Sequence, residues 1–252
     1  MIKIKTEEEI SLMRQGGKIL SEVLWEVLAA AKPGISEMAL DALAEKRIRE
    51  KGGEPGFQKV PGYKHTICVS TNDVVVHGIP TEYRLQEGDV FGVDCGVFYK
   101  GFHTDMAHTI VVGGKKSSEV DVFLKTGEKA LTAGIAEAKG GNRVGHISKA
   151  IQDIVENQGG YSIVRTLVGH GVGKNLHEEP EIPGFLSRDI KKTPQLTVGM
   201  TIAVEIIYNI GGKEIMYKND DGWTISTADE KISGLFERTI AITERNPIVL
   251  TS

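Results

Sequence analysis

The stretch GVDCGVFYKGFHTDMAHTIVV, residues 92–112, predicts two apolar strands joined by a turn, with an aspartate inside each strand. If the turn consists of residues 100–101 alone, Asp94 pairs with Ala107 across the hairpin. Asp105 lies two positions from Ala107, so both aspartates share one face. An ionised carboxylate in an apolar strand is costly unless a cation, a proton or a metal ion balances it. The hairpin therefore predicts a charged site on one face of a sheet.

The composition is that of an ordinary globular protein, with 252 residues, 40% hydrophobic, 25% charged and a net charge of −4. This charge gives no reason to expect a nucleic-acid partner or an acidic membrane surface. The N-terminus MIKIKTEEEISLMRQ has no signal-peptide core, and no window approaches the ~18 apolar residues of a membrane span. Cys68 and Cys95 are not spaced as a zinc or redox motif, which favours buried thiols in a reducing compartment. We expect a cytoplasmic protein without a membrane partner.

Short motifs recur in the second part of the chain and indicate two related halves. AKPG at 31–34 recurs 107 residues later as AKGG at 138–141, and Val93-Asp94 recurs 111 residues later as Val204-Glu205. This period is too long for a solenoid unit. It predicts an α+β fold of two pseudo-symmetric halves of antiparallel strands backed by helix pairs, roughly 1–114 and 115–252, within a single catalytic domain, 1–252.

The expected elements follow the same order in each half. Thr6-Glu-Glu-Glu9 predicts a capping box at the start of the first helix, and Ser36 predicts the N-cap of a second helix that ends near Glu50. Two further helices are expected at about 118–139 and 143–158. Alternating and apolar runs predict strands within the segments 65–72, 74–80, 89–113, 162–173, 200–212 and 236–243.

Other acids interrupt apolar strands in the second half. Glu205 lies in TIAVEII and Glu237 lies in LFERTIAIT. A single strand aspartate is often paired with a surface lysine or arginine, but four acids in four apolar strands indicate a shared centre for divalent cations. His170, between two glycines in GHGVGKNLHEEP, is a further candidate ligand, and His77 in VVVHGIP has a similar setting.

This set of residues resembles the type I methionine aminopeptidases, which have the pita-bread fold. The resemblance covers essentially the whole chain, from IKTEEEISLMRQGGKI through HGIP and GHGVGKNLHEEP to NDDGWTIST. It implies removal of the initiator methionine from nascent proteins and peptides with a small second residue, by water activated by two metal ions. The implied metal ligands are Asp94, Asp105, His170, Glu205 and Glu237.

The resemblance also implies roles around the metal ions. Glu205 is expected to transfer a proton to the leaving amine, and His77 and His177 are expected to hydrogen-bond the substrate and the developing oxyanion. An apolar pocket of methionine size is expected from Phe57, Tyr63, Cys68, Leu176 and Trp223.

Cofactors and partners follow from the same resemblance. The ligand set suits two divalent ions, Co, Mn, Fe or Zn, and a monovalent cation site is a further expectation at Asn72, Val74 and Ser233. The expected partner is a peptide or nascent-chain N-terminus, and the protein is expected to be a monomer.

Four positions depart from the family pattern. Ile206 replaces the proline that usually follows the proton-transfer glutamate, and Arg238 replaces a histidine. Leu176 stands where phenylalanine is common, and Val60 replaces a pocket aromatic. The latter two changes predict a wider, less aromatic pocket with relaxed methionine selectivity.

Two alternatives are separate predictions. An Xaa-Pro aminopeptidase or dipeptidase has the same fold but generally has an additional N-terminal domain, for which residues 1–35 leave no room. A non-catalytic pita-bread binding module would fit the changes at Ile206 and Arg238, although such proteins typically lack metal ligands that this sequence retains.

Overall fold

The computed structural model describes residues 2–114 and 117–252. Residues 115–116, beside the expected boundary between the halves, lie outside the described residues. The helices are α1 (Glu7–Ala30), α2 (Glu37–Glu50), α3 (Ser118–Ala136) and α4 (Val144–Gln152), with short helical segments η1 (Phe57–Lys59), η2 (Asp153–Gln158) and η3 (Ile190–Lys192). The strands are β1 (Glu54–Pro55), β2 (Ile67–Thr71), β3 (Val74–Val76), β4 (Val90–Tyr99), β5 (Phe102–Val111), β6 (Ser162–Ile163), β7 (Gly169–Gly171), β8 (Glu178–Ile182), β9 (Thr201–Asn209), β10 (Ile215–Tyr217), β11 (Ile225–Thr227), β12 (Ser233–Ala241) and β13 (Ile248–Val249).

The first half consists of the antiparallel sheet β1-β4-β2, with β5 paired to β4, and the helices α1 and α2. Thr6 and Glu9 form the predicted capping box of α1, and the Ser36 side chain accepts the Ala39 N–H at the start of α2. Both helices pack their apolar sides on one face of the sheet, in a core that includes Leu20, Leu24, Ile67, Phe91 and Val93.

The second half repeats this plan with α3, α4 and the antiparallel sheet β13-β12-β9-β7-β8, to which β6 adds at β9. Its apolar core includes Phe123, Ile147, Val204, Ile206 and Phe236. The segment 162–173, where strand was expected, contains two short strands, β6 and β7, which residues 164–168 separate. Strand β8 was not expected from the sequence. Its residues, EEPEI, include three glutamates and a central proline, which are uncommon in strands.

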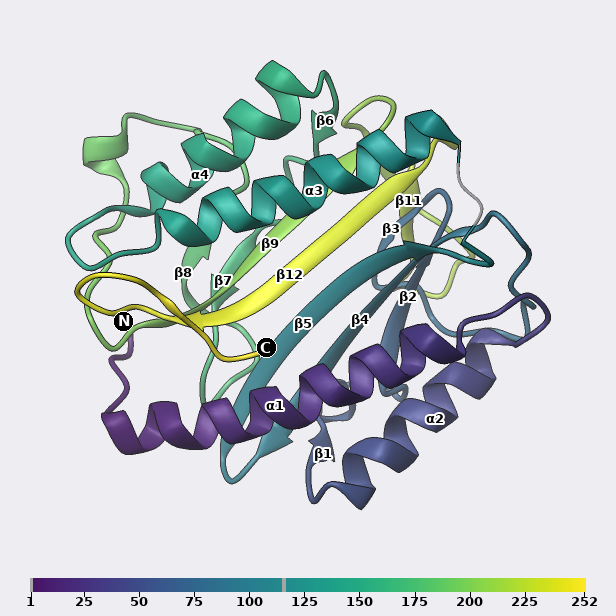
Figure 1. The fold of residues 1–252 in the computed structure, drawn as a ribbon, viewed down its shortest axis with the longest axis horizontal. Helices are drawn as coiled ribbons and strands as arrows, with labels where there is room; N and C mark the ends of the chain where they lie inside the picture. Colours follow the sequence, from purple (N-terminus) through teal and green to yellow (C-terminus); the bar gives the residue numbers. More distant parts are fainter. Residues whose placement is uncertain (1, 115–116) are drawn as a thin grey trace.

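The halves meet where β5 lies beside β12, and α1 and α3 cover these strands from the same side (Figure 1). We call the contact of these two strands the central junction. Threonine side chains connect it: Thr239 Oγ1 accepts the Asp105 N–H and donates to the Asp105 carbonyl, both at 2.8 Å. Thr109 Oγ1 makes the equivalent pair with Leu235, at 3.0 Å from its N–H and 2.7 Å to its carbonyl. The junction thus has the approximate two-fold symmetry expected from the sequence repeat.

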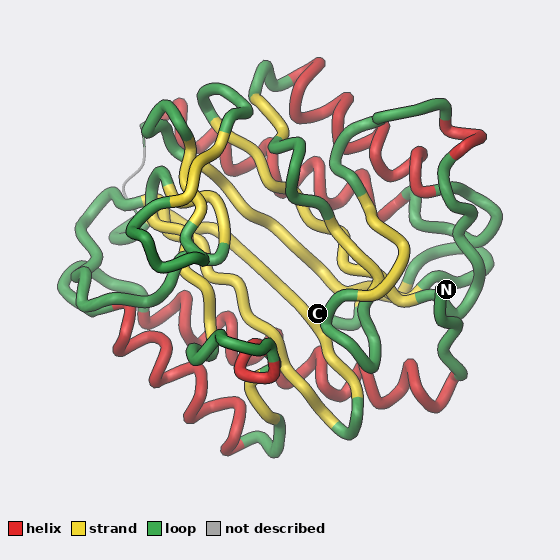
Figure 2. The backbone as a smooth tube through the Cα atoms, turned by 180° about the vertical axis from the view of Figure 1, so that it is seen from behind, coloured by secondary structure: helices red, strands yellow, loops and turns green. Residues whose placement is uncertain are grey.

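None of the helices α1–α4 covers the opposite side of the long strands, which is bordered by loops, shorter strands and a short helical turn (Figure 2). The short sheet β10-β11-β3 lies at one end of this side. Side chains that alternate with the helix-covered core positions therefore point into this concave side. Among the described helices, none combines the length and the hydropathy needed to cross a bilayer.

Candidate metal centre

The β4–β5 hairpin has the register predicted from the sequence. Lys100 and Gly101 both have positive φ, 47° and 92°, as a two-residue turn of this kind requires. Asp94 pairs with Ala107, and Asp105 pairs with Gly96 on the same hairpin. Both carboxylates therefore lie on the concave face, away from α1 and α2.

The second half brings its candidate ligands to the same place from three strands. Glu205 on β9 pairs directly with Glu237 on β12, and His170 on β7 pairs with Ala203. His170 Nε2 lies 3.9 Å from Asp105 Oδ2 and 4.0 Å from Glu237 Oε1. The ligand atoms of Asp105, His170 and Glu237 all lie within 4.8 Å of one another. The predicted residues from both halves thus converge.

Burial and mutual repulsion raise the pKa values of all four carboxyl groups. Burial, followed by the charge of Glu205, raises the pKa of Asp105 to about 7. Burial, followed by the charge of Asp94, raises the pKa of Glu205 to about 8. Burial is also the main reason why the pKa values of Asp94 and Glu237 lie well above their ordinary range. Without cations, the four groups cannot all be ionised near neutral pH.

The donor set fits divalent metal ions. His170 Nδ1 lies 2.9 Å from the Gly171 carbonyl, which can only accept, so the ring donates there and Nε2 keeps a lone pair directed toward Asp105 and Glu237. Burial is the main cause that lowers the pKa of His170 to about 3, so the ring is neutral. Asp94 Oδ1 and Glu237 Oε1 are buried and have no hydrogen-bond partner within residues 2–114 and 117–252. Buried acceptors that lack donors are the expected consequence of a site built for cations.

The five candidate ligands line a cavity of about 560 Å³ on the concave face. His77 and His177 also line it, and the rings of His170 and His177 meet edge to face at 4.3 Å. Burial lowers the pKa values of His77 and His177. Both rings are therefore neutral at pH 7, and each can offer one N–H to a bound molecule.

One wall of the cavity is apolar and contains the residues predicted for it. Those residues are Phe57, Tyr63, Cys68, Leu176 and Trp223. All except Trp223 are buried, and they form one cluster that also contacts Val60 and Ile79. The Cys68 thiol lies 3.1 Å from the Tyr63 hydroxyl, which donates to the Ile67 carbonyl. The cavity therefore combines an acidic floor with an apolar, sulfur-containing wall.

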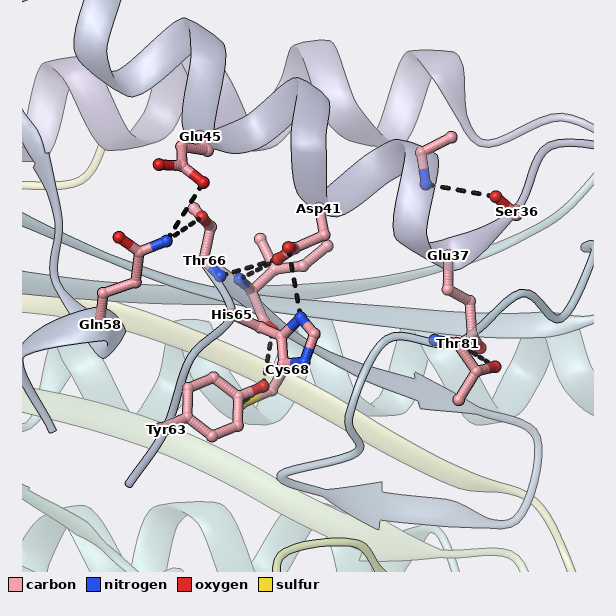
Figure 3. A network of polar contacts seen from close by, with 12 residues as sticks. Ser36, Glu37, Asp41, Glu45, Gln58, Tyr63, His65, Thr66, Cys68 and Thr81 are labelled. Atoms are coloured by element: carbon pink, nitrogen blue, oxygen red, sulfur yellow. Dashed lines mark hydrogen bonds and ion pairs between the residues drawn. The ribbon is translucent and has the colours of Figure 1, made fainter. Parts of the chain in front are cut away.

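A polar network from α2 supports this wall (Figure 3). Asp41 is buried and points toward the start of β2, where it accepts the N–H groups of Thr66 at 2.7 Å and Ile67 at 3.0 Å. The same carboxylate lies 3.4 Å from His65 Nδ1. The short segment that contains Tyr63 and Cys68 is therefore fixed to the helix behind it.

The sequence did not identify several residues of the cavity. Thr166, Leu167 and Val168 line it from the segment between β6 and β7, which the sequence predicted as strand. Ile207 and Leu235 also line it. These two lie two positions from Glu205 and Glu237, so strand alternation was a signal that could have found them.

The four departures from the family pattern separate by the face on which they lie. Ile206 is fully buried in the core under the helices, and Arg238 donates to the carbonyls of Ala107 at 3.1 Å and Glu237 at 2.7 Å. Neither Ile206 nor Arg238 is among the described residues that line the cavity. Val60 and Leu176 do line it, so these two bear on the size and shape of the apolar wall.

The residues expected for a monovalent cation lie near one another, away from the carboxylates. Asn72 has a φ of 56°, and its carbonyl accepts the Ser233 N–H at 2.9 Å. The Ser233 hydroxyl donates to the Tyr208 carbonyl at 3.3 Å. Val74 begins β3 beside them. A cation at this place stays a prediction.

Comparisons with known proteins agree over the whole chain. A profile of metallopeptidase family M24 matches residues 11–244. A methionine aminopeptidase of Clostridium perfringens is 41% identical over 251 residues, which cover 100% of this chain and 99% of that protein. The crystal structure of methionine aminopeptidase from Thermotoga maritima superposes with a TM-score of 0.96 at 36% identity and covers 100% of both chains. The prolidase from Pyrococcus furiosus, at a TM-score of 0.78 and 23% identity, shares the fold over 99% of this chain and 65% of its own.

Proposed function

The chain belongs to metallopeptidase family M24, and we propose that it removes methionine from the N-termini of peptides and nascent proteins with a small second residue. The resemblance found in the sequence is confirmed by a methionine aminopeptidase that is 41% identical over the full chain. The observation that carries the proposal is the cavity, because an acidic centre and an apolar wall of suitable composition lie in one space. Sequence identity favours this activity over the Xaa-Pro alternative, whose structural relative is only 23% identical.

In this proposal two divalent ions are held by Asp94, Asp105, His170, Glu205 and Glu237. Carboxylates and a neutral imidazole suit Mn, Fe, Co or Zn, and the choice among these metals stays a prediction. The buried oxygens Asp94 Oδ1 and Glu237 Oε1 support the assignment, since no described residue donates a hydrogen bond to either. The metal pair, when bound, polarises a carbonyl and makes water a nucleophile near neutral pH.

The chain's own residues would perform the remaining steps. Glu205 lies in the cavity among the other candidate ligands, and its carboxylate is suited to accept a proton from the attacking water and to donate it to the leaving amine. His77 and His177 would donate hydrogen bonds to the substrate carbonyl oxygen as negative charge develops there. Tyr63, Cys68 and Trp223, together with the rest of the apolar wall, would hold the methionine side chain and exclude water from it.

The wider setting is also part of the proposal. We place the protein in the cytoplasm, acting as a monomer on peptide or nascent-chain N-termini, without direct binding of nucleic acid or membranes. Residues 1–252 would act as a single catalytic domain, because the candidate ligands come from both halves. The monovalent cation at Asn72, Val74 and Ser233 would support the fold rather than the reaction.

The proposal is tested with metal-reconstituted protein and a panel of short peptides. We expect the protein to release methionine from Met-Ala-Ser. It should remove the N-terminal leucine of Leu-Ala-Ser and the N-terminal alanine of Ala-Ala-Ser more slowly. Cleavage of Ala-Pro alone would establish the Xaa-Pro activity instead. Stoichiometric metal binding with no turnover of any peptide would establish the binding module.

A further inference from the structure

Residues 173–178 lead from β7 into Glu178, the first residue of β8. Leu176, His177 and Glu178 from this segment line the cavity, and the segment is also held by contacts outside it. Glu178 accepts hydrogen bonds from Lys5 Nζ at 2.8 Å, from the Asn175 N–H at 3.2 Å and from Lys3 Nζ at 3.3 Å. One carboxylate thus connects the cavity wall to the segment that precedes α1.

The two lysines differ in their burial. The side chains of Lys5 and Glu178 are 5% and 3% exposed, whereas that of Lys3 is 50% exposed. Loss of one partner of a buried ion pair leaves an uncompensated charge, while an exposed ion pair contributes little. Burial raises the pKa of Glu178, but the hydrogen bonds from Lys5, Asn175 and Lys3 reverse this, and the net pKa is lowered. Lys5 is therefore the dominant partner.

A glycine allows the close approach of Lys5 to the segment. A Cβ at Gly173 would lie 2.5 Å from Lys5 Cε and 2.7 Å from Lys5 Nζ, which is closer than van der Waals contact allows. The Lys5 backbone is itself fixed, because its N–H donates to the Gly199 carbonyl at 2.8 Å. The backbone of Gly173 is held by β5 as well, because its carbonyl accepts the His103 N–H at 2.7 Å. Lys5 thus reaches the segment from an anchored position.

We infer that Lys5 is a positioning residue for the peptidase. Through its buried ion pair with Glu178, it fixes residues 173–178 so that His177 faces the substrate carbonyl and Leu176 closes the methionine pocket. The inference rests on the function proposed above and adds a determinant of both rate and side-chain selectivity. A displacement of about 1 Å in a group that orients the substrate can cost up to about 10²-fold in rate.

The test compares Lys5→Met with Lys3→Met, since both lysines contact Glu178 and only one is buried. Lys5→Met is expected to lower kcat/KM on Met-Ala-Ser by about tenfold or more and to narrow the preference for methionine over leucine. Lys3→Met is expected to stay within about twofold of the wild type. Mn²⁺ affinity by calorimetry should be unchanged in both, because neither lysine contacts a proposed ligand. Equal kinetics for the two variants would overturn the inference.

Two further variants cover the case in which Lys5→Met does not fold. Gly173→Ala displaces only flexible side-chain ends, so the fold should persist while Lys5 moves away and kcat/KM falls. Lys5→Arg keeps the charge and should recover most of the activity. Normal kinetics for Gly173→Ala, or no recovery with Lys5→Arg, would contradict the inference.

Hydrogen exchange separates this inference from the proposed function. Amides of residues 173–178 should exchange faster in Lys5→Met than in the wild type, with or without peptidase activity. Wild-type protein that cleaves no methionine peptide would overturn the function alone, whereas unchanged exchange in an active Lys5→Met variant would overturn only the positioning role.

Discussion

The two halves of the molecule bring their candidate ligands together in different ways. The first half supplies Asp94 and Asp105 from one hairpin, in which β4 and β5 pair along their whole length. The second half supplies His170, Glu205 and Glu237 from β7, β9 and β12, which are far apart in the sequence. The spacing of the first pair depends on local register, whereas the second set depends on packing between distant segments.

This difference indicates where the centre is robust and where it is sensitive. A paired hairpin keeps two side chains in place even when its turn is weakened, because every ladder bond maintains the register. The position of one half relative to the other depends on the central junction, where threonine hydroxyls replace ladder bonds. We expect the largest effects from the ligands, smaller ones from the junction and the smallest from the turn.

Removal of a ligand is the first and largest test. Asp105→Asn is expected to lower kcat on Met-Ala-Ser by at least about 10³-fold, since it removes one charge from the part of the centre where both halves meet. The fold should persist, because the substitution also removes one of four mutually repelling carboxylates. Kinetics, circular dichroism and metal stoichiometry check this. Normal turnover with full metal content would show that Asp105 is not a ligand.

The main elements of the first half could be predicted from its sequence, although β1 and η1 were not. The capping residues Thr6 and Ser36, and the pairing of Asp94 with Ala107, agree with the structure. Each depends on interactions between residues close in the chain, where the local pattern contains enough information. The shared face of Asp94 and Asp105 followed from the same register.

The second half could be predicted only in part. Glu205 and Glu237 stood out as acids in apolar strands, but their direct pairing depends on the register of two strands that no short turn connects. The break at residues 164–168 was missed because this stretch, VRTLV, contains no glycine or proline that would mark the end of a strand. The contact of Lys5 with Glu178 joins segments far apart in sequence and leaves no local pattern.

Metal removal should affect stability in a pH-dependent way. Without cations, the folded protein retains protons on Asp105 and Glu205, whose pKa values are raised to about 7 and about 8, while the unfolded chain is ionised above about pH 4. The folded state therefore binds more protons, and the stability of the metal-free protein falls as pH rises from about 4 to 8. Each unit by which the folded-state pKa exceeds the unfolded-state pKa contributes about 1.4 kcal/mol to this fall.

Thermal unfolding with a chelator and with added Mn²⁺, at pH 5, 6, 7 and 8, measures this effect. The stabilisation by metal should increase with pH, and the double variant Asp105→Asn, Glu205→Gln should show a flatter dependence in the metal-free state. Metal-free stability that rises over this range would contradict the like-charge description of the centre.

The junction is tested by a matched pair of threonines. Thr239→Val and Thr109→Val each remove a buried hydroxyl that bonds one N–H and one carbonyl, so each should cost about 1–3 kcal/mol of stability. Only Thr239 holds the backbone of a proposed ligand, Asp105. We expect its loss to lower kcat/KM about tenfold more than the loss of Thr109. Equal activity of the two variants would show that the junction does not set the geometry of the centre.

The turn of the hairpin gives the smallest expected effect. Gly101 has a φ of 92° and an alanine Cβ would meet no atom within 4 Å, so Gly101→Ala should cost about 1 kcal/mol through backbone strain alone. Lys100→Asn should have the opposite sign, a gain of up to about 1 kcal/mol, because asparagine tolerates the φ of 47° better than lysine does. Chemical denaturation measures both changes. Neither variant should change kcat by more than about twofold, since the ladder between β4 and β5 holds Asp94 and Asp105 in register without help from the turn. A loss of kcat in Gly101→Ala would instead show that the turn controls the spacing of the two carboxylates. The geometry of the first half would then depend on one local feature, as the position of the second half depends on the central junction.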